Sequence, residues 1–230
     1  MEVLGEALRD ALALLLEGDG QTYEIIARSL RVSLTATLVA FALGLPLGML
    51  LAFGSFPGRR WLQAAVNTGM GMPPVVIGLL VTVMLWRSGP FGALELLYTP
   101  TAMVVAQAVI AFPLVAGISA ASLQQVDPDF RLQMEALGAT RARALWSVAV
   151  EARLPLLAAV MAGFGAVVSE VGAAMMVGGN IEGQTRVLTT AAVLETSRGD
   201  FAAAIAFGLI LLAIAFAVNL VLTLAQQRGR

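Results

Sequence analysis

The chain has 230 residues, of which 59% are hydrophobic and 13% are charged, and its mean hydropathy is +0.86. Soluble domains average about 45–50% apolar and about 25% charged residues, so this composition excludes an ordinary soluble domain. The sequence has no cysteine and no histidine, which removes disulfides, thiol nucleophiles and the commonest zinc ligands. We therefore predict a polytopic, all-α membrane protein without a metal site.

The amino-terminal residues 2–17 alternate acidic side chains with Leu and Ala at helical spacing. This pattern predicts a short amphipathic helix on a membrane surface. A cap that stabilises the fold fits the pattern as well as a functional segment does. Gly18, Asp19 and Gly20 end the helix.

Five apolar segments are long enough to cross a hydrocarbon core of about 30 Å. They lie at about 29–53, 61–86, 100–123, 155–178 and 201–224. In the second segment Pro73 and Pro74 must interrupt the helix. A broken helix at membrane depth is normally buried in protein or lines a cavity, so a functional lining and a packing kink both remain open. After the fourth segment, residues 185–197 predict another short amphipathic helix.

The longest central stretch that is too charged to cross a bilayer is 125–154. Asp127 and Pro128 are a good helix start, because Asp caps free N–H groups and proline fits the first helical position. Gly138 is predicted to end this helix in a left-handed conformation, and Thr140 to cap a second helix. The pattern indicates a helix, a glycine elbow and a second helix between two spans. A solvated loop with amphipathic helices, and no docking role, is the alternative.

All 14 basic residues are arginine. Without a lysine, the sequence cannot form the phosphate-binding loop G-x-x-x-x-G-K-[ST]. If ATP drives this protein, a partner subunit must hold the ATP and its Mg, and the chain itself is not expected to be an enzyme or to bind a cofactor.

The central stretch resembles the cytoplasmic loop of ABC importer permeases that docks on an ATP-binding subunit. The likeness rests on Glu135-Ala136-Leu137-Gly138-Ala139 and on Leu154-Pro155. In the family pattern, Glu-Ala-Ala falls at the positions that Leu132-Gln133-Met134 occupy in this chain. The family's Leu-Pro pair also lies about one helical turn before the position of Leu154-Pro155. The resemblance implies coupling to the ATPase through Glu135, Ala136, Gly138, Ala139, Thr140 and Arg141.

The resemblance covers about residues 24–226, and residues 169–201 look most like the permeases of tungstate and molybdate importers, the tungstate branch above all. It implies a homodimer in a prokaryotic cytoplasmic membrane, two ATP-binding subunits, and an extracytoplasmic binding protein that delivers the oxyanion. Nucleic acid is not an expected partner. Sulfate or phosphate is an alternative substrate. A stand-alone channel or secondary transporter is the rival from another class, but coupling ions in such proteins usually need several intramembrane acids or histidines.

A tetrahedral dianion would be attracted by outer arginines such as Arg186 and Arg198. Helix-end N–H groups and hydroxyls could then receive it along the path. The predicted path residues are Pro73, Pro74, Gly178, Gly179, Asn180, Thr185, Arg186 and Thr189. A simple helix stop at the glycines and solvated arginines are the alternative.

Five spans place the two termini on opposite sides. The short turn that contains Arg59 and Arg60 has no acidic residue, and the central stretch is also rich in arginine. The positive-inside rule therefore places the central loop and the carboxyl terminus in the cytoplasm and the amino terminus outside.

Glu170 is the lone carboxylate well inside a predicted span. Such a group is costly and is a functional candidate by default, yet a negative side chain beside a dianion path would repel the substrate. We therefore predict a structural role, in which Glu170 is protonated or is bonded to a backbone group or to a polar side chain of a neighbouring helix. Gating is the alternative.

Overall fold

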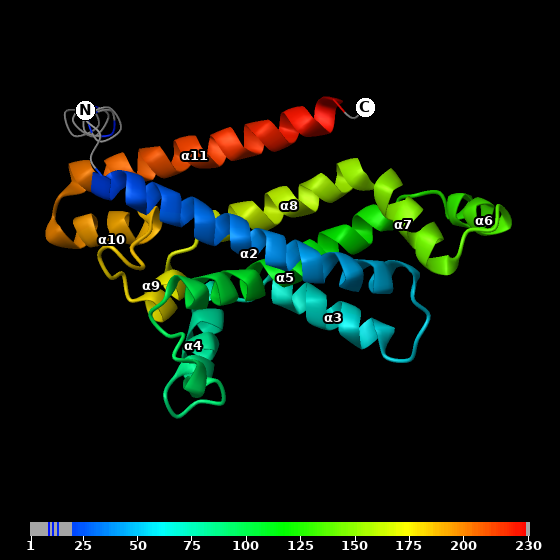
Figure 1. Ribbon diagram of the computed structural model, residues 1–230, viewed down its shortest axis with the longest axis horizontal. Helices are drawn as coiled ribbons and strands as arrows, with labels where there is room; N and C mark the ends of the chain where they lie inside the picture. Colours follow the sequence, from blue (N-terminus) through cyan, green and yellow to red (C-terminus); the bar gives the residue numbers. More distant parts are fainter. Residues whose placement is uncertain (1–8, 10, 12, 14–19, 229–230) are drawn as a thin grey trace.

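The computed structural model describes residues 9, 11, 13 and 20–228. These residues form α-helices, turns and one short 3-10 helix, and no strand occurs among them, which confirms the predicted all-α class. The amphipathic helix predicted at 2–17 falls outside the described residues, apart from positions 9, 11 and 13, which are helical. The elements are α2 (Gly20–Phe53), α3 (Arg59–Met70), α4 (Pro74–Leu85), η1 (Gly92–Leu94), α5 (Pro100–Leu123), α6 (Pro128–Ala136), α7 (Arg141–Glu151), α8 (Arg153–Val168), α9 (Gly172–Gly178), α10 (Leu188–Arg198) and α11 (Phe201–Arg228) (Figure 1).

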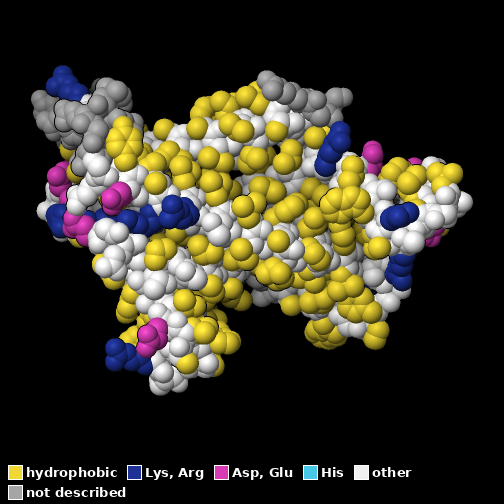
Figure 2. Space-filling view, in the orientation of Figure 1, with side chains coloured by type: hydrophobic (Ala, Val, Ile, Leu, Met, Phe, Trp, Pro, Cys, Tyr) yellow, Lys and Arg dark blue, Asp and Glu magenta, His cyan; other side chains and the backbone are white. Residues whose placement is uncertain are grey.

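Three of these helices, α2, α5 and α11, are long and apolar enough to cross a membrane. Two bent pairs would each add a span: α3 with α4, bent by 104°, and α7 with α8, bent by 72°. The surface agrees with a membrane position, because a broad apolar band covers the middle of the molecule while charged side chains gather at its ends and at the tip beyond α4 (Figure 2). The long axis of the molecule therefore lies roughly along the membrane normal.

The predicted span at 61–86 is not one helix. α3 ends at Met70, and Pro73 has extended backbone angles, φ −60° and ψ 125°, before Pro74 opens α4. A proline offers no backbone N–H and disfavours the helical conformation of the residue before it, so two in succession force the break. As a result α4 leaves the bundle at a steep angle (Figure 1).

The predicted span at 155–178 is also interrupted, at a place that the sequence pattern did not indicate. α8 ends at Val168 and α9 begins at Gly172. Between them the side chain of Glu170 accepts hydrogen bonds from the first free N–H groups of α9, so the break is capped from within.

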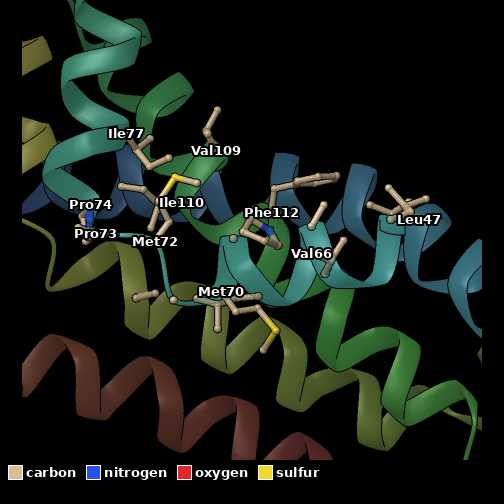
Figure 3. A pocket seen from close by; sticks show the side chains of 17 residues that line it. Leu47, Val66, Met70, Met72, Pro73, Pro74, Ile77, Val109, Ile110 and Phe112 are labelled. Carbon is tan, nitrogen blue, oxygen red and sulfur yellow. The ribbon is translucent and has the colours of Figure 1, made fainter. Parts of the chain in front are cut away.

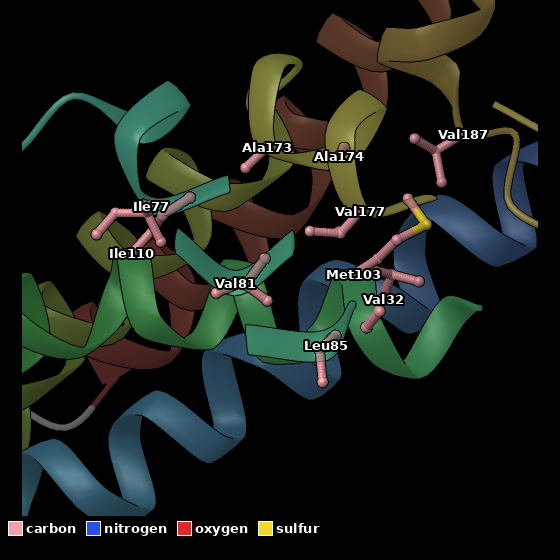
Figure 4. Close-up of a cluster of buried hydrophobic side chains, with 12 residues drawn as sticks. Val32, Ile77, Val81, Leu85, Met103, Ile110, Ala173, Ala174, Val177 and Val187 are labelled. Carbon is pink, nitrogen blue, oxygen red and sulfur yellow. The ribbon is translucent and has the colours of Figure 1, made fainter. Parts of the chain in front are cut away.

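α2 and α5 form the centre of the bundle and pack closely along their length. Glycine makes this possible at Gly48, because a Cβ there would lie 2.8 Å from the Cβ of Ser119. One face of α4 is buried against the bundle, because Ile77 and Val81 pack with Met103 of α5 and Val177 of α9 (Figure 4). By contrast α11 is largely open, and its Phe216 is 66% exposed, as expected of a surface that faces lipid.

The two ends of the long axis differ in composition and in the elements they contain. α9, α10 and the start of α2 lie together at one end, and α6, α7 and the last turns of α2 and α11 lie at the other (Figure 1). We refer to these as the α9–α10 end and the α6–α7 end. The residues that the sequence singles out fall at both ends and at the α3–α4 break.

Candidate functional site

The glycine elbow between α6 and α7 is built by local hydrogen bonds. The side chain of Asp127 accepts from the backbone N–H of Asp129 at 2.9 Å, and that of Thr140 accepts from the N–H of Arg143 at 3.4 Å. Gly138 has φ 85°, the left-handed conformation that the sequence predicted, and no atom lies within 4 Å of the position of an added Cβ. Glycine is therefore required there by backbone conformation and not by crowding.

The elbow is anchored on one side and open on the other. Phe130 and Val126 pack against the buried Leu123 and Val148, and the guanidinium of Arg131 lies 5.9 Å from the ring centre of Phe53 at the end of α2. On the open side Leu137, Trp146 and Leu132 are 80%, 66% and 57% exposed. The predicted coupling residues Glu135, Ala136, Gly138, Thr140 and Arg141 are also exposed, and Ala139 is half-buried. This is the exposure that a docking surface requires.

Glu170 is 7% exposed and closes the α8–α9 break. Its Oε1 accepts from the N–H of Ala173 at 2.9 Å and its Oε2 from the N–H of Ala174 at 3.0 Å. The hydroxyl of Thr189 in α10 donates to the Glu170 carbonyl at 3.1 Å. Glu170 is thus bonded to backbone groups of α9, and both of its oxygens act as acceptors within the fold.

The two threonines of the predicted path are committed to the fold in the same way. The Thr185 hydroxyl is fully buried, donates to the Gly178 carbonyl at 2.6 Å and accepts from the Ile181 N–H at 2.9 Å. It therefore closes the loop that follows α9. Because the hydroxyl hydrogens of Thr185 and Thr189 are both used by backbone carbonyls, neither threonine presents a free donor to an anion.

Gly179 and Asn180 turn the chain after α9. Their φ values are 70° and 52°, and a Cβ at Gly179 would lie 2.8 Å from the Tyr98 ring. The pair ends the helix, as its sequence indicated. Nearby, Arg186 is paired with Glu182 at 3.3 Å, while Arg186 Nε and Asn180 Oδ1 are buried without a hydrogen-bond partner among the described residues.

Pro73 and Pro74 lie apart from this group, in an apolar cavity of about 610 Å³ between the α3–α4 break and α5. Met70, Met72, Ile110 and Phe112 line it with them (Figure 3). The structure therefore divides the predicted path residues into two sets: an apolar set at the α3–α4 break and a polar, hydrogen-bonded set at the α9–α10 end.

Two features were missed at the level of sequence. Arg28 of α2 donates to the carbonyls of Arg186 and Gly183 at 2.9 and 2.7 Å, so it joins two segments that are far apart in the chain. Gln63 and Asn67 of α3 form a hydrogen-bonded amide pair at 3.1 Å. Only the second had a sequence signal, because two amides four residues apart inside an apolar span share one helical face.

Residues 44–230 match the family described as the inner membrane component of binding-protein-dependent transport systems. The chain is 40% identical over 227 residues to the tungstate uptake system permease protein TupB of Peptoclostridium acidaminophilum, which covers 99% of this chain and 100% of that protein. It is also 41% identical over 200 residues to a probable anion ABC transporter permease protein of Haloferax volcanii, with 85% and 86% of the two chains covered. Among solved structures, a chain of the inward-facing MetNI methionine ABC transporter matches with a TM-score of 0.74 and 18% identity over 94% of this chain and 99% of that one, which shows a shared fold. The chain therefore belongs to the inner membrane components of binding-protein-dependent transport systems, the permease subunits of ABC importers.

Proposed function

We propose that this chain forms the translocation path of an ATP-driven importer of tungstate, with molybdate as the other oxyanion that fits. The observation that carries the proposal is identity along nearly the whole chain to a permease named for tungstate uptake. The similarity to a probable anion permease supports the same class of substrate. Transport in this proposal occurs without chemistry on the oxyanion, so the chain itself is not catalytic.

The ATPase partner is assigned to the α6–α7 end. The exposed apolar side chains of Leu137 and Trp146 support this, because a large apolar surface beside arginines is typical of a protein interface. ATP and its Mg belong to two such partner subunits, since this sequence has no lysine for a phosphate-binding loop.

A second copy of the chain completes the path. The outward face of α4 is apolar and projects from the bundle: Val75, Val76, Leu79, Leu80, Val83 and Met84 are all exposed. The loop beyond it holds the exposed, charged Arg87 and Glu95. Charges are costly against lipid, so cover by a two-fold related copy is the arrangement that accounts for this arm, and two-fold dimers are the commonest closed assembly.

The binding protein then docks at the α9–α10 end, outside the cytoplasmic membrane, and the α6–α7 end and the carboxyl terminus face the cytoplasm. Arginines in the Arg59–Arg60 turn and in α6 and α7 support this orientation through the positive-inside rule.

The test is reconstitution of the permease in liposomes with its ATPase and its binding protein. Tungstate or molybdate should stimulate ATP hydrolysis only when all three are present, and the permease alone should hydrolyse none. Sulfate and phosphate serve as matched oxyanions that decide the substrate class. Stimulation by neither metal oxyanion in an assembled complex, or robust hydrolysis by the purified permease alone, would contradict the proposal.

A further inference from the structure

A polar groove of about 460 Å³ runs between α3 and α5, separate from the residues that the sequence assigned to the path. It begins at the α6–α7 end, where Arg59 and Gln124 lie, and continues past Gln63 and Asn67 to Met70. α3 packs against α5, and the groove residues that α5 contributes, from Gly117 to Ala121, lie in the second half of that helix. Met70 also lines the apolar cavity at the α3–α4 break, so the groove and that cavity meet at this residue.

One amide in the groove is held with its hydrogen-bond donor free. Gln63 Nε2 donates to Asn67 Oδ1 at 3.1 Å, which fixes the Asn67 amide with its nitrogen unused. Among the described residues the Asn67 nitrogen has no protein acceptor, and Asn67 and Gln124 are both exposed. No acidic residue lines the groove.

Arg59 places a positive charge at the mouth of the groove. Its Nε and Nη2 both donate to the Leu51 carbonyl, at 3.0 and 2.7 Å, so the guanidinium is held in position by the end of α2. The remaining nitrogen and the charge of the half-buried side chain are not taken up by any ion pair in the described part of the chain.

The exposed amides of Asn67 and Gln124 would be costly against lipid, because unpaired polar groups in hydrocarbon lose their hydrogen bonds. α3 must therefore face water or protein on this side. Neutral donors suit an oxyanion that has to pass: they replace part of its hydration without the tight binding that a buried charge would give. An apolar constriction at the far end can close such a path by excluding water.

We propose that the α3–α5 groove is the cytoplasmic half of the oxyanion path, in which Gln63, Asn67 and Gln124 contact the anion, Arg59 attracts it toward the exit, and Met70 marks the apolar constriction. This assignment rests on the proposed function, since it takes the oxyanion as the transported species.

The natural absence of cysteine makes a direct test possible. Gln63→Cys, Asn67→Cys and Gln124→Cys are each introduced into the chain, assembled with its ATPase in lipid nanodiscs, and treated with a charged methanethiosulfonate. All three should be modified, and Phe216→Cys on the lipid-facing side of α11 should not. Lack of modification of the groove positions in a complex that transports overturns the proposal, because lipid or a partner chain then fills the groove.

Charge substitutions test the ligand. Asn67→Asp keeps the shape of the side chain but sets a negative charge beside the anion, and it should lower the oxyanion uptake rate by more than about tenfold, since like charges repel strongly in a low-dielectric path. Gln227→Glu makes the equivalent change at an exposed position of α11, outside the groove and outside the α6–α7 elbow, and should leave uptake within about twofold. Arg59→Gln should lower uptake by about tenfold, with Arg59→Lys retaining most of it.

The two hypotheses fail in different ways. If Asn67→Asp and Gln227→Glu both take up the oxyanion at the wild-type rate, the groove assignment is overturned and the importer is left intact. If the groove cysteines are modified but the assembled complex takes up no oxyanion, the proposed function is overturned. The oxyanion is then also excluded as the ligand of this groove.

Discussion

The α9–α10 end and the α6–α7 end use polar residues in opposite ways. At the first end, buried side chains join segments far apart in the chain: Ser29 accepts from the Leu188 N–H at 2.8 Å, and Thr189 donates to the Glu170 carbonyl at 3.1 Å. At the second end, the hydrogen bonds of Asp127 and Thr140 reach only two or three residues along the chain, and the apolar side chain of Leu137 stays 80% exposed.

The two ends therefore differ in how much of their polar and apolar surface is paired or buried within the chain. The α9–α10 end satisfies most of its own buried polar groups, with Asn180 Oδ1 and Arg186 Nε as exceptions, so we expect its residues to contribute chiefly to stability. The α6–α7 end is locally well formed but leaves its surface uncovered, so we expect its residues to contribute chiefly to association. Substitutions ordered by their expected effect on the stability of the isolated permease should follow that division.

The largest loss of stability is expected for Glu170→Leu. It leaves the buried N–H groups of Ala173 and Ala174 without acceptors, each costing about 1–3 kcal/mol. Thermal unfolding of the detergent-purified chain should shift strongly downward, whereas Glu151→Leu at an exposed position of α7 should change it little. Glu170→Gln keeps one acceptor oxygen and should unfold at an intermediate temperature with near-normal uptake. If Gln abolishes uptake while the complex stays assembled, the carboxylate has a role beyond capping.

Thr185→Val comes next, because it removes the hydroxyl that bridges the Gly178 carbonyl and the Ile181 N–H while keeping the side-chain shape. We expect a loss of about 1–3 kcal/mol in the free energy of unfolding. Thr196→Val, on an exposed part of α10, is the matched control. Stability is measured by denaturation in detergent. Equal stability of the two variants would show that buried hydrogen bonds do not hold the α9–α10 end together.

Gly138→Val should cost about 1–2 kcal/mol, since a β-branched residue resists a φ of 85° even where space is free. The larger effect should be on function, because the substitution changes the direction of α6 relative to α7. The variant should no longer co-purify with the ATPase and should lose uptake. Gly138→Asn, which tolerates the left-handed conformation, should keep both. Gly208→Val adds the same side chain where no atom lies within 4 Å and φ is ordinary, so it controls for bulk alone.

Leu137→Ser should hardly change stability, because the side chain is mostly exposed in the isolated chain. It should nevertheless weaken ATPase binding, as seen by affinity measurement on the purified subunits. A stable variant with unchanged affinity would show that the exposed surface of the α6–α7 end is covered by something other than the ATPase.

Local signals predicted much of this structure. The helix starts at Asp127 and Thr140, the left-handed Gly138 and the break at Pro73 each depend on residues within a few positions in the chain, and each is present. The interruption at Glu170 was missed because hydropathy treats the fourth segment as uniform, while the break depends on one side chain replacing a helical carbonyl.

The roles of Thr185 and Arg28 were beyond the sequence for a different reason. Both act through hydrogen bonds to backbone carbonyls that the fold alone brings within reach, one seven residues away and one more than a hundred. The polarity of Thr185 suggested a ligand for an anion, and only the geometry shows that its hydroxyl is already engaged.

The central claim is that this chain forms a path that ATP hydrolysis at the α6–α7 end drives. The most direct test is accumulation of tungstate by proteoliposomes that contain the permease and its ATPase, supplied with the binding protein on the outer face and ATP in the lumen. The account predicts accumulation above the external concentration, dependent on ATP and lost in Gly138→Val. Equilibration to the external concentration without ATP would contradict it, because that is the behaviour of a channel.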